Sequence, residues 1–390
     1  MASNDAYPIR TTNRDRMLGR VVNLPGQSRA ALSAFLGLSR SAGASIVSDL
    51  IDEGLLREGA LAATDRRLGR SSTGIYPAMP SGAVLALDFG HRHVAVALAD
   101  LEGKLLGKYR ALFDVDHNAI GAVDHACQLV RSLLEDARTD IKSVSATVAS
   151  IPGPIDSRTG IVRSPTILSG WIGLDPAKEI GRRIGTDVTV FNDANLGAWG
   201  ERVYGAGRDF RDFVYVKASD GIGAGLVIAG EIYDGSDGLS GEIGHTLVDS
   251  ENTLCRCGNS GCIEVIASSS AVRARLMFTH PAVTAEQPLA SLTDPVSERI
   301  FSDAGRSLGR IVADMCNLLN PSAVIIGGEL GEVGEPFVAG IREMIDRIAQ
   351  PATASSVRVL SASLGRDAEL MGAVARSLAI GRQLRFSAVM

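Results

Sequence analysis

The first 60 residues carry the apolar spacing of three short helices. Apolar side chains recur every three or four positions over 13–22, 28–36 and 39–51, and serines at the start of the second and third segments can cap them. Gly37 turns the chain between these two segments. Two short helices joined by a glycine turn predict a helix-turn-helix, with 39–51 as its second helix.

Two strand-like stretches follow this helical region. One begins past Leu56, the other covers Gly74–Pro77, and an arginine-rich loop, 65–72, lies between them. We interpret strand, loop and strand as a wing. Residues 1–80 contain ten Arg, no Lys and seven Asp or Glu, so their net charge is about +3 against about −8 for the remainder. A basic segment with this pattern predicts contact with DNA.

The predicted DNA contacts lie at the start of the second helix and in the arginine-rich loop. N-terminal residues of a recognition helix reach base edges in the major groove, and loop arginines suit phosphates or a narrow minor groove. Arg40 is the best candidate for contacting a base or a phosphate. Gly43, in the middle of the helix, costs about 1 kcal/mol of helix stability relative to alanine. A solvated loop is the alternative for the loop arginines. The expected DNA-binding residues are Ser39, Arg40, Ser41, Ser45, Arg66, Arg67 and Arg70.

The character of the chain changes near residue 82, after a linker-like stretch at 78–82. A meander of three apolar, strand-like segments occupies 83–113, and helices and strands then alternate. A similar meander recurs over 213–233. The repeat predicts two related α/β halves with a cleft between them.

The composition is typical of a soluble globular protein. Hydrophobic residues make up 45% and charged residues 21% of the chain. No apolar run approaches the ~20 residues that a membrane span needs, and the N-terminus has no apolar signal-peptide core. We therefore expect a cytoplasmic protein without a membrane segment.

Three of the five cysteines lie close together and near a histidine. One imidazole and three thiolates at such short spacings can close a tetrahedron around Zn²⁺ with no open position, which describes a structural metal site. A polar, glycine-rich loop cannot order itself by apolar burial, so metal ligation would supply that free energy. Three buried, unligated cysteines are the alternative. The predicted ligands are His245, Cys255, Cys257 and Cys262. We call residues 245–262, which these ligands delimit, the zinc loop.

Polar residues beside this loop are joined by others at a strand end. Asn192 and Asp193 follow a strand-like stretch, and strand ends are where α/β folds place ligands. With Glu242, His245 and Glu264 they offer fixed donors and acceptors for a polyhydroxylated ligand. A solvated acidic surface is the alternative interpretation.

The pattern as a whole resembles the ROK family of repressors and sugar kinases, over nearly the whole chain. The resemblance rests on Ile151–Pro154, Ser164–Trp171, Asn192–Glu201, Gly241–His245 and the Cys255–Glu264 segment. It implies a two-lobed, actin-like (ribonuclease-H-like) ATPase fold, a hexose-type ligand in the cleft, and zinc on the four predicted ligands.

The resemblance also implies roles for single residues. In kinases of the family, the position of Asp193 is the base that takes a proton from the sugar hydroxyl. The positions of Glu242, His245 and Glu264 hold the sugar, so His245 would serve both the metal and the ligand. Gly153 joins the expected ligand contacts.

Two turns that hold nucleotide phosphates in these kinases are altered. The kinases have Asp-x-Gly-Gly-Thr, where this chain places His91 and Arg92 against the phosphates. They have Gly-Thr-Gly where this chain has Asp220, whose charge repels a triphosphate. We therefore expect no catalytic residue and a vestigial base at Asp193 that binds sugar. The opposing interpretation is that Arg92 pairs with a phosphate and restores nucleotide binding.

The sequence predicts an α/β protein with a winged helix-turn-helix DNA-binding domain, 1–80, followed by a ROK-type sugar-sensing domain, 82–390. The expected protein is not an enzyme. It represses carbohydrate genes by binding a double-stranded DNA operator as a homo-oligomer, a dimer or tetramer, and it responds to a sugar or sugar phosphate. Structural Zn²⁺ is the expected cofactor. The alternatives are a sugar kinase with an appended DNA-binding head, and an architectural DNA-binding protein whose sensor has lost its ligand.

Overall fold

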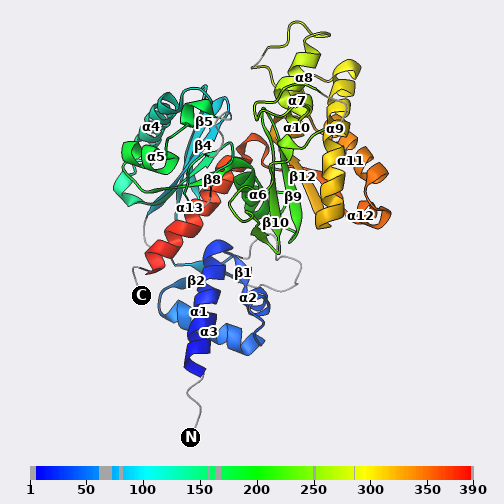
Figure 1. The fold of residues 1–390 in the computed structure, drawn as a ribbon. Coiled ribbons are helices and arrows are strands. Elements are labelled where there is room, and N and C mark those ends of the chain that lie inside the picture. The colour runs from blue at the N-terminus through cyan, green and yellow to red at the C-terminus, as the bar shows by residue number, and fades with distance from the viewer. Residues whose placement is uncertain are drawn as a thin grey trace.

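The chain folds into a small N-terminal head and a larger body with two lobes (Figure 1). The computed structural model describes residues 6–60, 73–78, 82–156, 159–162, 168–248, 252–284 and 286–387, with side chains described from residue 13 to residue 384 within these ranges. Figure 1 shows the head below the two lobes, close to the C-terminal end of the chain.

The head contains three helices and a small sheet. The helices are α1 Ala6–Asn23, α2 Arg29–Phe35 and α3 Arg40–Asp52, and the strands are β1 Gln27–Ser28, β2 Leu56–Gly59 and β3 Gly74–Pro77. The sheet has the order β1-β3-β2, and both pairs are antiparallel. Both predicted caps are confirmed: the Ser28 hydroxyl accepts from the Ala31 amide, and the Ser39 hydroxyl accepts from the Ala42 amide, each at 3.2 Å.

Two details of the head differ from the sequence prediction. Helix α1 begins at Ala6, earlier than residue 13, and the two-residue strand β1 was not predicted. Strand β1 pairs with β3, which is distant in sequence, so the local pattern does not indicate it. No single helix in the described ranges is long and apolar enough to cross a membrane, and the bent pair α2 and α3 meets that test by length and composition alone.

Gly43 has a role in helix packing that its low helix propensity does not reveal. It lies where α3 crosses α2, and a Cβ atom at this position would lie 2.0 Å from the Ser33 hydroxyl and 3.1 Å from the Ser33 Cα. Neither distance is compatible with van der Waals contact, and the Cα belongs to the backbone of α2. Glycine therefore lets the two helices of the helix-turn-helix approach closely.

We expect Gly43→Ala to destabilise the head by about 1–2 kcal/mol, because overpacking outweighs the roughly 1 kcal/mol gain in helix propensity. Hydrogen exchange of α3 amides in the full-length protein measures this change. Gly19→Ala is the matched control, because a Cβ there meets nothing within 4 Å in α1. That variant should gain stability, and an equal gain from Gly43→Ala would contradict the packing role.

Lobe 1 is built on a five-stranded sheet with the order β6-β5-β4-β7-β8. The strands are β4 Ala83–Gly90, β5 His93–Asp100, β6 Leu105–Leu112, β7 Val144–Ile151 and β8 Val188–Asn192, and the outer helices are α4 Ala119–Asp136 and α5 Pro176–Ile184. The first three strands form an antiparallel meander, and β7 and β8 continue the sheet in parallel. The predicted meander over 83–113 is confirmed.

Lobe 2 is built on a second five-stranded sheet, β11-β10-β9-β12-β13. Its strands are β9 Phe213–Ala218, β10 Ile222–Ile228, β11 Glu231–Ile232, β12 Ala323–Gly327 and β13 Arg358–Ser361. Its helices are α7 Glu264–Ala267, α8 Ser269–Leu276, α9 Pro295–Leu319, α10 Gly328–Val333, α11 Glu335–Ile348 and α12 Pro351–Ser356. An antiparallel meander again continues into two parallel strands, so the predicted repeat is confirmed.

Two helices, α6 Asp193–Tyr204 and α13 Ala368–Ser387, lie between the two sheets (Figure 1). Leu370 and Val374 of α13 pack on the sheet of lobe 1, whereas Ala198 of α6 packs on the sheet of lobe 2. The helices touch through small residues: a Cβ on Gly372 would lie 1.8 Å from a carbonyl oxygen of α6. This contact fixes the N-terminus of α6 at the junction of the lobes.

Hydrogen bonds and an ion pair join the head to the body. In α13, the Arg382 guanidinium donates to the carbonyl of Val22 in the head at 2.9 Å and to the carbonyl of Leu101 in lobe 1 at 2.8 Å. Arg57 of β2 pairs with Glu102 of lobe 1 at 3.2 Å. Burial lowers the pKa of Arg20 in α1, and lobe 2 adds nearby charges of both signs. A relative movement of the lobes would therefore change the surroundings of the head.

Candidate functional site

The four predicted metal ligands gather at one point of lobe 2. The ligand atoms of His245, Cys255, Cys257 and Cys262 all lie within 4.8 Å of one another. The Cys257 and Cys262 sulfurs are 3.6 Å apart, and the Cys255 sulfur is 3.7 Å from His245 Nδ1. Sulfurs bound tetrahedrally at ~2.3 Å from Zn²⁺ would be about 3.8 Å apart. The cluster therefore fits a four-coordinate metal ion.

The zinc loop reaches this geometry through a tight backbone turn. The Cys255 amide donates to the Asn259 carbonyl at 2.7 Å, and the Gly258 amide donates to the Cys255 carbonyl at 2.9 Å. Gly258 has a φ of 94°, which favours glycine because it has no Cβ. The turn brings Cys255 and Cys257 to the same side, facing the end of the loop.

All six predicted sugar ligands line a single pocket between the lobes, which we call the acidic pocket. The pocket has a volume of about 40 Å³. Its predicted members are Gly153, Asn192, Asp193, Glu242, His245 and Glu264. The structure brings these residues together from both lobes, although they lie at three separate places in the sequence: 153, 192–193 and 242–264.

Helix termini position the main acidic groups of this pocket. Asn192 caps α6 by accepting from the Asn195 amide at 3.1 Å, and its side-chain amide donates to the Gly153 carbonyl at 3.1 Å. Asp193 is the first residue of α6, and Glu264 is the first residue of α7. Burial, followed by the charges of Asp193 and Glu264, raises the pKa of Glu242 to about 7. Crowded carboxyl groups of this kind suit hydrogen bonding to hydroxyls.

Lys217 is a site residue that the sequence analysis missed. Its ammonium lies 2.5 Å from Asp193 Oδ2, and the pair is buried between β9 and α6. Burial opposes the charge on Lys217, but the carboxylates of Asp193 and Glu369 outweigh burial and raise its pKa. The other oxygen of Asp193 accepts from the Ala194 amide at 2.7 Å. Both oxygens of the kinase-base position are therefore engaged.

Glu369 completes this buried cluster from α13. It accepts from the Tyr215 hydroxyl at 3.2 Å and lies 3.9 Å from the Lys217 ammonium. Burial raises the pKa of Glu369 to about 7, and the charge of Lys217 offsets only part of that effect. At neutral pH the Glu369 carboxyl group is therefore about half protonated beside the ion pair.

Stability should fall as Glu369 ionises. Its pKa is about 7 when folded and roughly 4.3 when unfolded, so its contribution is complete below pH ~4.3 and lost as pH rises through 7. In that interval the unfolding free energy loses at most about 1.4 kcal/mol per pH unit from this group. Urea unfolding at pH 5, 6 and 7 should show this slope in wild type and a shallower one in Glu369→Gln. Exposed Glu298→Gln serves as control, and parallel wild-type and Glu369→Gln profiles would contradict the assignment.

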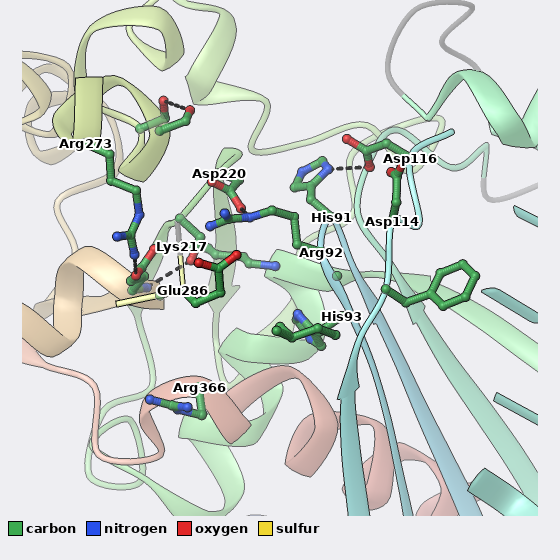
Figure 2. A pocket seen from close by; sticks show the side chains of 18 of the residues that line it. His91, Arg92, His93, Asp114, Asp116, Lys217, Asp220, Arg273, Glu286 and Arg366 are labelled. Carbon is green, nitrogen blue, oxygen red and sulfur yellow. Dashed lines mark hydrogen bonds and ion pairs between the residues drawn. The ribbon is translucent and has the colours of Figure 1, made fainter. Parts of the chain in front are cut away.

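The two altered phosphate turns contact each other across the cleft. Arg92, between β4 and β5, donates to Asp220 Oδ2 at 2.6 Å (Figure 2). His91 Nδ1 lies 2.7 Å from Asp116, and His91 Nε2 would lie 2.8 Å from a Cβ on Gly221. The two turns are thus joined by an ion pair, and the His91 imidazole packs against the opposite turn.

A larger cavity, of about 1180 Å³, remains beside these turns (Figure 2). It is lined by both lobes and includes Gly90, Lys217, Ser268, Arg273, Glu286 and Gly328. Gly328, which lines the cavity, directly follows β12 and begins α10. The paired residues Arg92 and Asp220 are themselves part of the wall of this cavity.

The predicted DNA contacts fall into two groups. Ser39, Arg40, Ser41 and Ser45 are all exposed on the N-terminal half of α3. Next to these residues, the Arg29 guanidinium donates to the Ala44 carbonyl at 3.1 Å and the Ser48 hydroxyl at 2.9 Å, which ties α2 to α3. The second group, Arg66, Arg67 and Arg70, lies outside the described residues.

Comparison with known proteins separates two kinds of relative. The xylose repressor of Bacillus spizizenii is 28% identical over 371 residues, which are 93% of this chain and 94% of that protein. The glucokinase of Thermotoga maritima is 29% identical over 76% of this chain and 97% of its own length. A solved ROK family transcriptional regulator, a homologue of the E. coli Mlc protein, has a TM-score of 0.75 at 25% identity and covers 98% of this chain and 99% of that one.

The match to the glucokinase leaves about a quarter of this chain unmatched, whereas the regulators match nearly all of it. The body has the actin-like α/β fold of sugar kinases, with two mixed sheets. The model of the ROK family matches residues 84–379, which is well over half of the chain. The resemblance inferred from the motifs is confirmed, and this chain belongs to the ROK family.

Proposed function

We propose that this chain is a sugar-responsive transcriptional repressor whose body binds a carbohydrate without phosphorylating it. The observation that carries the proposal is the buried ion pair between Lys217 and Asp193. A repressor needs to bind a sugar but not to phosphorylate it. The ion pair leaves Asp193 in the pocket while Lys217 engages the carboxylate that would act as the base. The similarity to a xylose repressor and to a ROK transcriptional regulator over the full chain supports the same function.

The absence of phosphoryl transfer follows from the state of Asp193 and of the two turns. A general base needs a carboxylate oxygen within reach of the hydroxyl proton. Here one oxygen pairs with Lys217 and the other accepts from the backbone, so each oxygen keeps a lone pair that can accept from a ligand hydroxyl. The phosphate turns are occupied by Arg92 and Asp220, which pair with each other. Asp193 is therefore proposed as a vestigial base that only holds the ligand.

The proposed effector is a sugar held by the acidic pocket. Carboxylates and amides accept paired hydrogen bonds from neighbouring hydroxyls, and the six predicted ligands supply such groups. A structural Zn²⁺ on the His245 and Cys255 cluster would fix the zinc loop, which carries His245 and ends beside Glu264. Xylose and glucose, the sugars that the relatives' names indicate, are the first candidates.

The proposed DNA-binding unit is the head, residues 1–80, and the proposed sensor is 82–390. Exposed Arg40 and its neighbours would enter the major groove, and the wing arginines Arg66, Arg67 and Arg70 would contact phosphates or the minor groove. A homo-oligomer would place two heads on two half-sites. Because the head contacts lobe 1 and α13, a movement of the lobes would change the spacing of the two heads.

One observation favours a second candidate function. The cavity of about 1180 Å³ beside Gly328 is large enough for a nucleoside, and the chain is similar to a glucokinase. A sugar kinase with a DNA-binding head is therefore the competing proposal. A phosphorylation assay separates the two candidates.

Two variants should separate DNA binding from sugar binding. Arg40→Ala should weaken binding to a duplex selected on wild type from a random library, by about 5- to 150-fold for the loss of one base contact. Its sugar affinity should be unchanged. Glu264→Gln should weaken sugar binding by about 10- to 100-fold, because one charged hydrogen-bond acceptor is lost. Its DNA affinity without sugar should be unchanged.

Fluorescence anisotropy measures the DNA affinities, and calorimetry with D-xylose and D-glucose measures the sugar affinities. Ser355→Ala, on the exposed surface of α12, is a control for both. If no selected duplex binds better than a scrambled one, the repressor proposal is wrong. Equal loss of both activities in either variant would indicate unfolding, which circular dichroism detects.

A further inference from the structure

Two of the ion pairs that join the lobes lie beside the phosphate turns. A separate pair, Lys108 with Asp367, joins β6 of lobe 1 to the segment that precedes α13. Arg92 in lobe 1 pairs with Asp220 in lobe 2 at 2.6 Å. Figure 2 shows these two side chains pointing toward each other. In the opposite direction, Arg256 of the zinc loop in lobe 2 lies 3.5 Å from Asp116 Oδ2 in lobe 1. The two pairs therefore join the lobes on the side of the cleft where the phosphate turns meet.

The carboxylates of both pairs are tied to their own lobes. Asp220 accepts from the Ser269 hydroxyl of α8 at 2.9 Å. Asp116 is held by His91 at 2.7 Å, and its carbonyl accepts from the Gly170 amide at 2.7 Å. Because each carboxylate is fixed on its lobe, the ion pairs restrain the distance between the lobes.

Arg256 also occupies the acidic pocket. Its Nε donates to Glu264 Oε1 at 2.9 Å, while the Ile222 amide donates to Glu264 Oε2 at 3.2 Å. Both oxygens of this predicted sugar ligand are thus engaged. The volume left in the pocket, about 40 Å³, is far below the roughly 300 Å³ at which ligand pockets begin. Arg256 therefore competes with a sugar hydroxyl for Glu264, in a pocket that has little free volume.

We propose that Arg256 is the gate of the sugar pocket and, with Arg92, forms a latch that keeps the lobes together when no sugar is bound. The proposal rests on the proposed function of the pocket. A sugar that takes Glu264 as its hydrogen-bond acceptor displaces Arg256 from Glu264. The displaced guanidinium moves away from Asp116, and the restraint between the lobes is reduced.

The exposure of the two pairs suits a latch that a ligand can open. The Arg92 side chain is 45% exposed and that of Arg256 is 29% exposed. Ion pairs that contact solvent contribute little to stability. A ligand shifts an equilibrium only by its unequal affinity for the two states, and a sugar that fits only the open pocket meets this condition.

The latch can be tested without any sugar by hydrogen exchange on the full-length protein. Arg256→Gln changes lobe 2, and the amide to follow is that of Val115 in lobe 1, beside Asp116. Arg92→Gln changes lobe 1, and the amide to follow is that of Ser269 in lobe 2, beside Asp220. Each variant should accelerate exchange in the opposite lobe at least fivefold. Arg306→Gln, which removes a guanidinium paired within lobe 2, should leave both amides at the wild-type rate.

The gate is tested by calorimetry with D-xylose and D-glucose. Arg256→Gln should bind the preferred sugar at least fivefold more tightly than wild type, because no guanidinium competes for Glu264. Wild-type exchange in both variants would overturn the latch, and an unchanged or weaker sugar affinity in Arg256→Gln would overturn the gate. If exchange accelerates but neither sugar binds any variant, the latch holds and the proposed sensing of these sugars fails.

Discussion

Cys262→Ser is expected to abolish zinc binding at the proposed metal site and, with it, the proposed response to sugar. Structural zinc binding is worth about 10–16 kcal/mol over four ligands, so losing one thiolate should weaken binding at least about 100-fold. Without the metal, the polar zinc loop has little to order it, and the melting temperature should fall by about 5–10 °C. Because the loop carries His245 and Arg256, the acidic pocket should lose its shape.

Plasma emission spectrometry measures the zinc content, and calorimetry measures the sugar affinity. Cys127→Ala is the matched control, because Cys127 is a buried cysteine of α4 outside the cluster. This control should keep its zinc and its sugar affinity. If Cys262→Ser keeps one zinc per chain, or if wild type purified without chelator contains none, the assignment of the metal site is wrong.

Incubation with ATP, Mg²⁺ and D-glucose or D-xylose is expected to give no sugar phosphate. Kinase turnover is typically about 1–10³ s⁻¹, and we expect less than about 10⁻³ s⁻¹ from this chain. The physical reason is that Lys217 holds Asp193 while Arg92 and Asp220 occupy both phosphate turns. Lys217→Thr alone should not restore activity, because the turns remain bridged.

A coupled assay for ADP release measures this rate, with the glucokinase of Thermotoga maritima as the positive control. Turnover above about 1 s⁻¹ in wild type would establish the kinase candidate instead. Turnover that appears only in Lys217→Thr would show that the ion pair alone prevents the reaction, and that the bridged turns still accept phosphates.

Features that depend on neighbouring residues were determined by the sequence itself. The caps at Ser28 and Ser39, the meander over 83–113 and the turn at Gly37 follow from side-chain spacing and backbone preference within a few positions. The cysteines at 255, 257 and 262 lie within one short loop, so their spacing predicted the cluster that the structure contains. The family motifs in the sequence likewise indicated the two-lobed body.

Only the tertiary structure decided which groups meet across the chain. Lys217 is an unremarkable strand residue in the sequence, and it becomes the partner of Asp193 because β9 packs against α6. Arg92 and Asp220 are 128 positions apart, and their pairing depends on how closely the lobes approach. From its own helix propensity Gly43 is only a weak helix former, yet the close crossing of α2 and α3 requires a residue without a Cβ at this position. Such contacts are set by the packing of whole elements, which no local pattern of apolar and polar residues encodes.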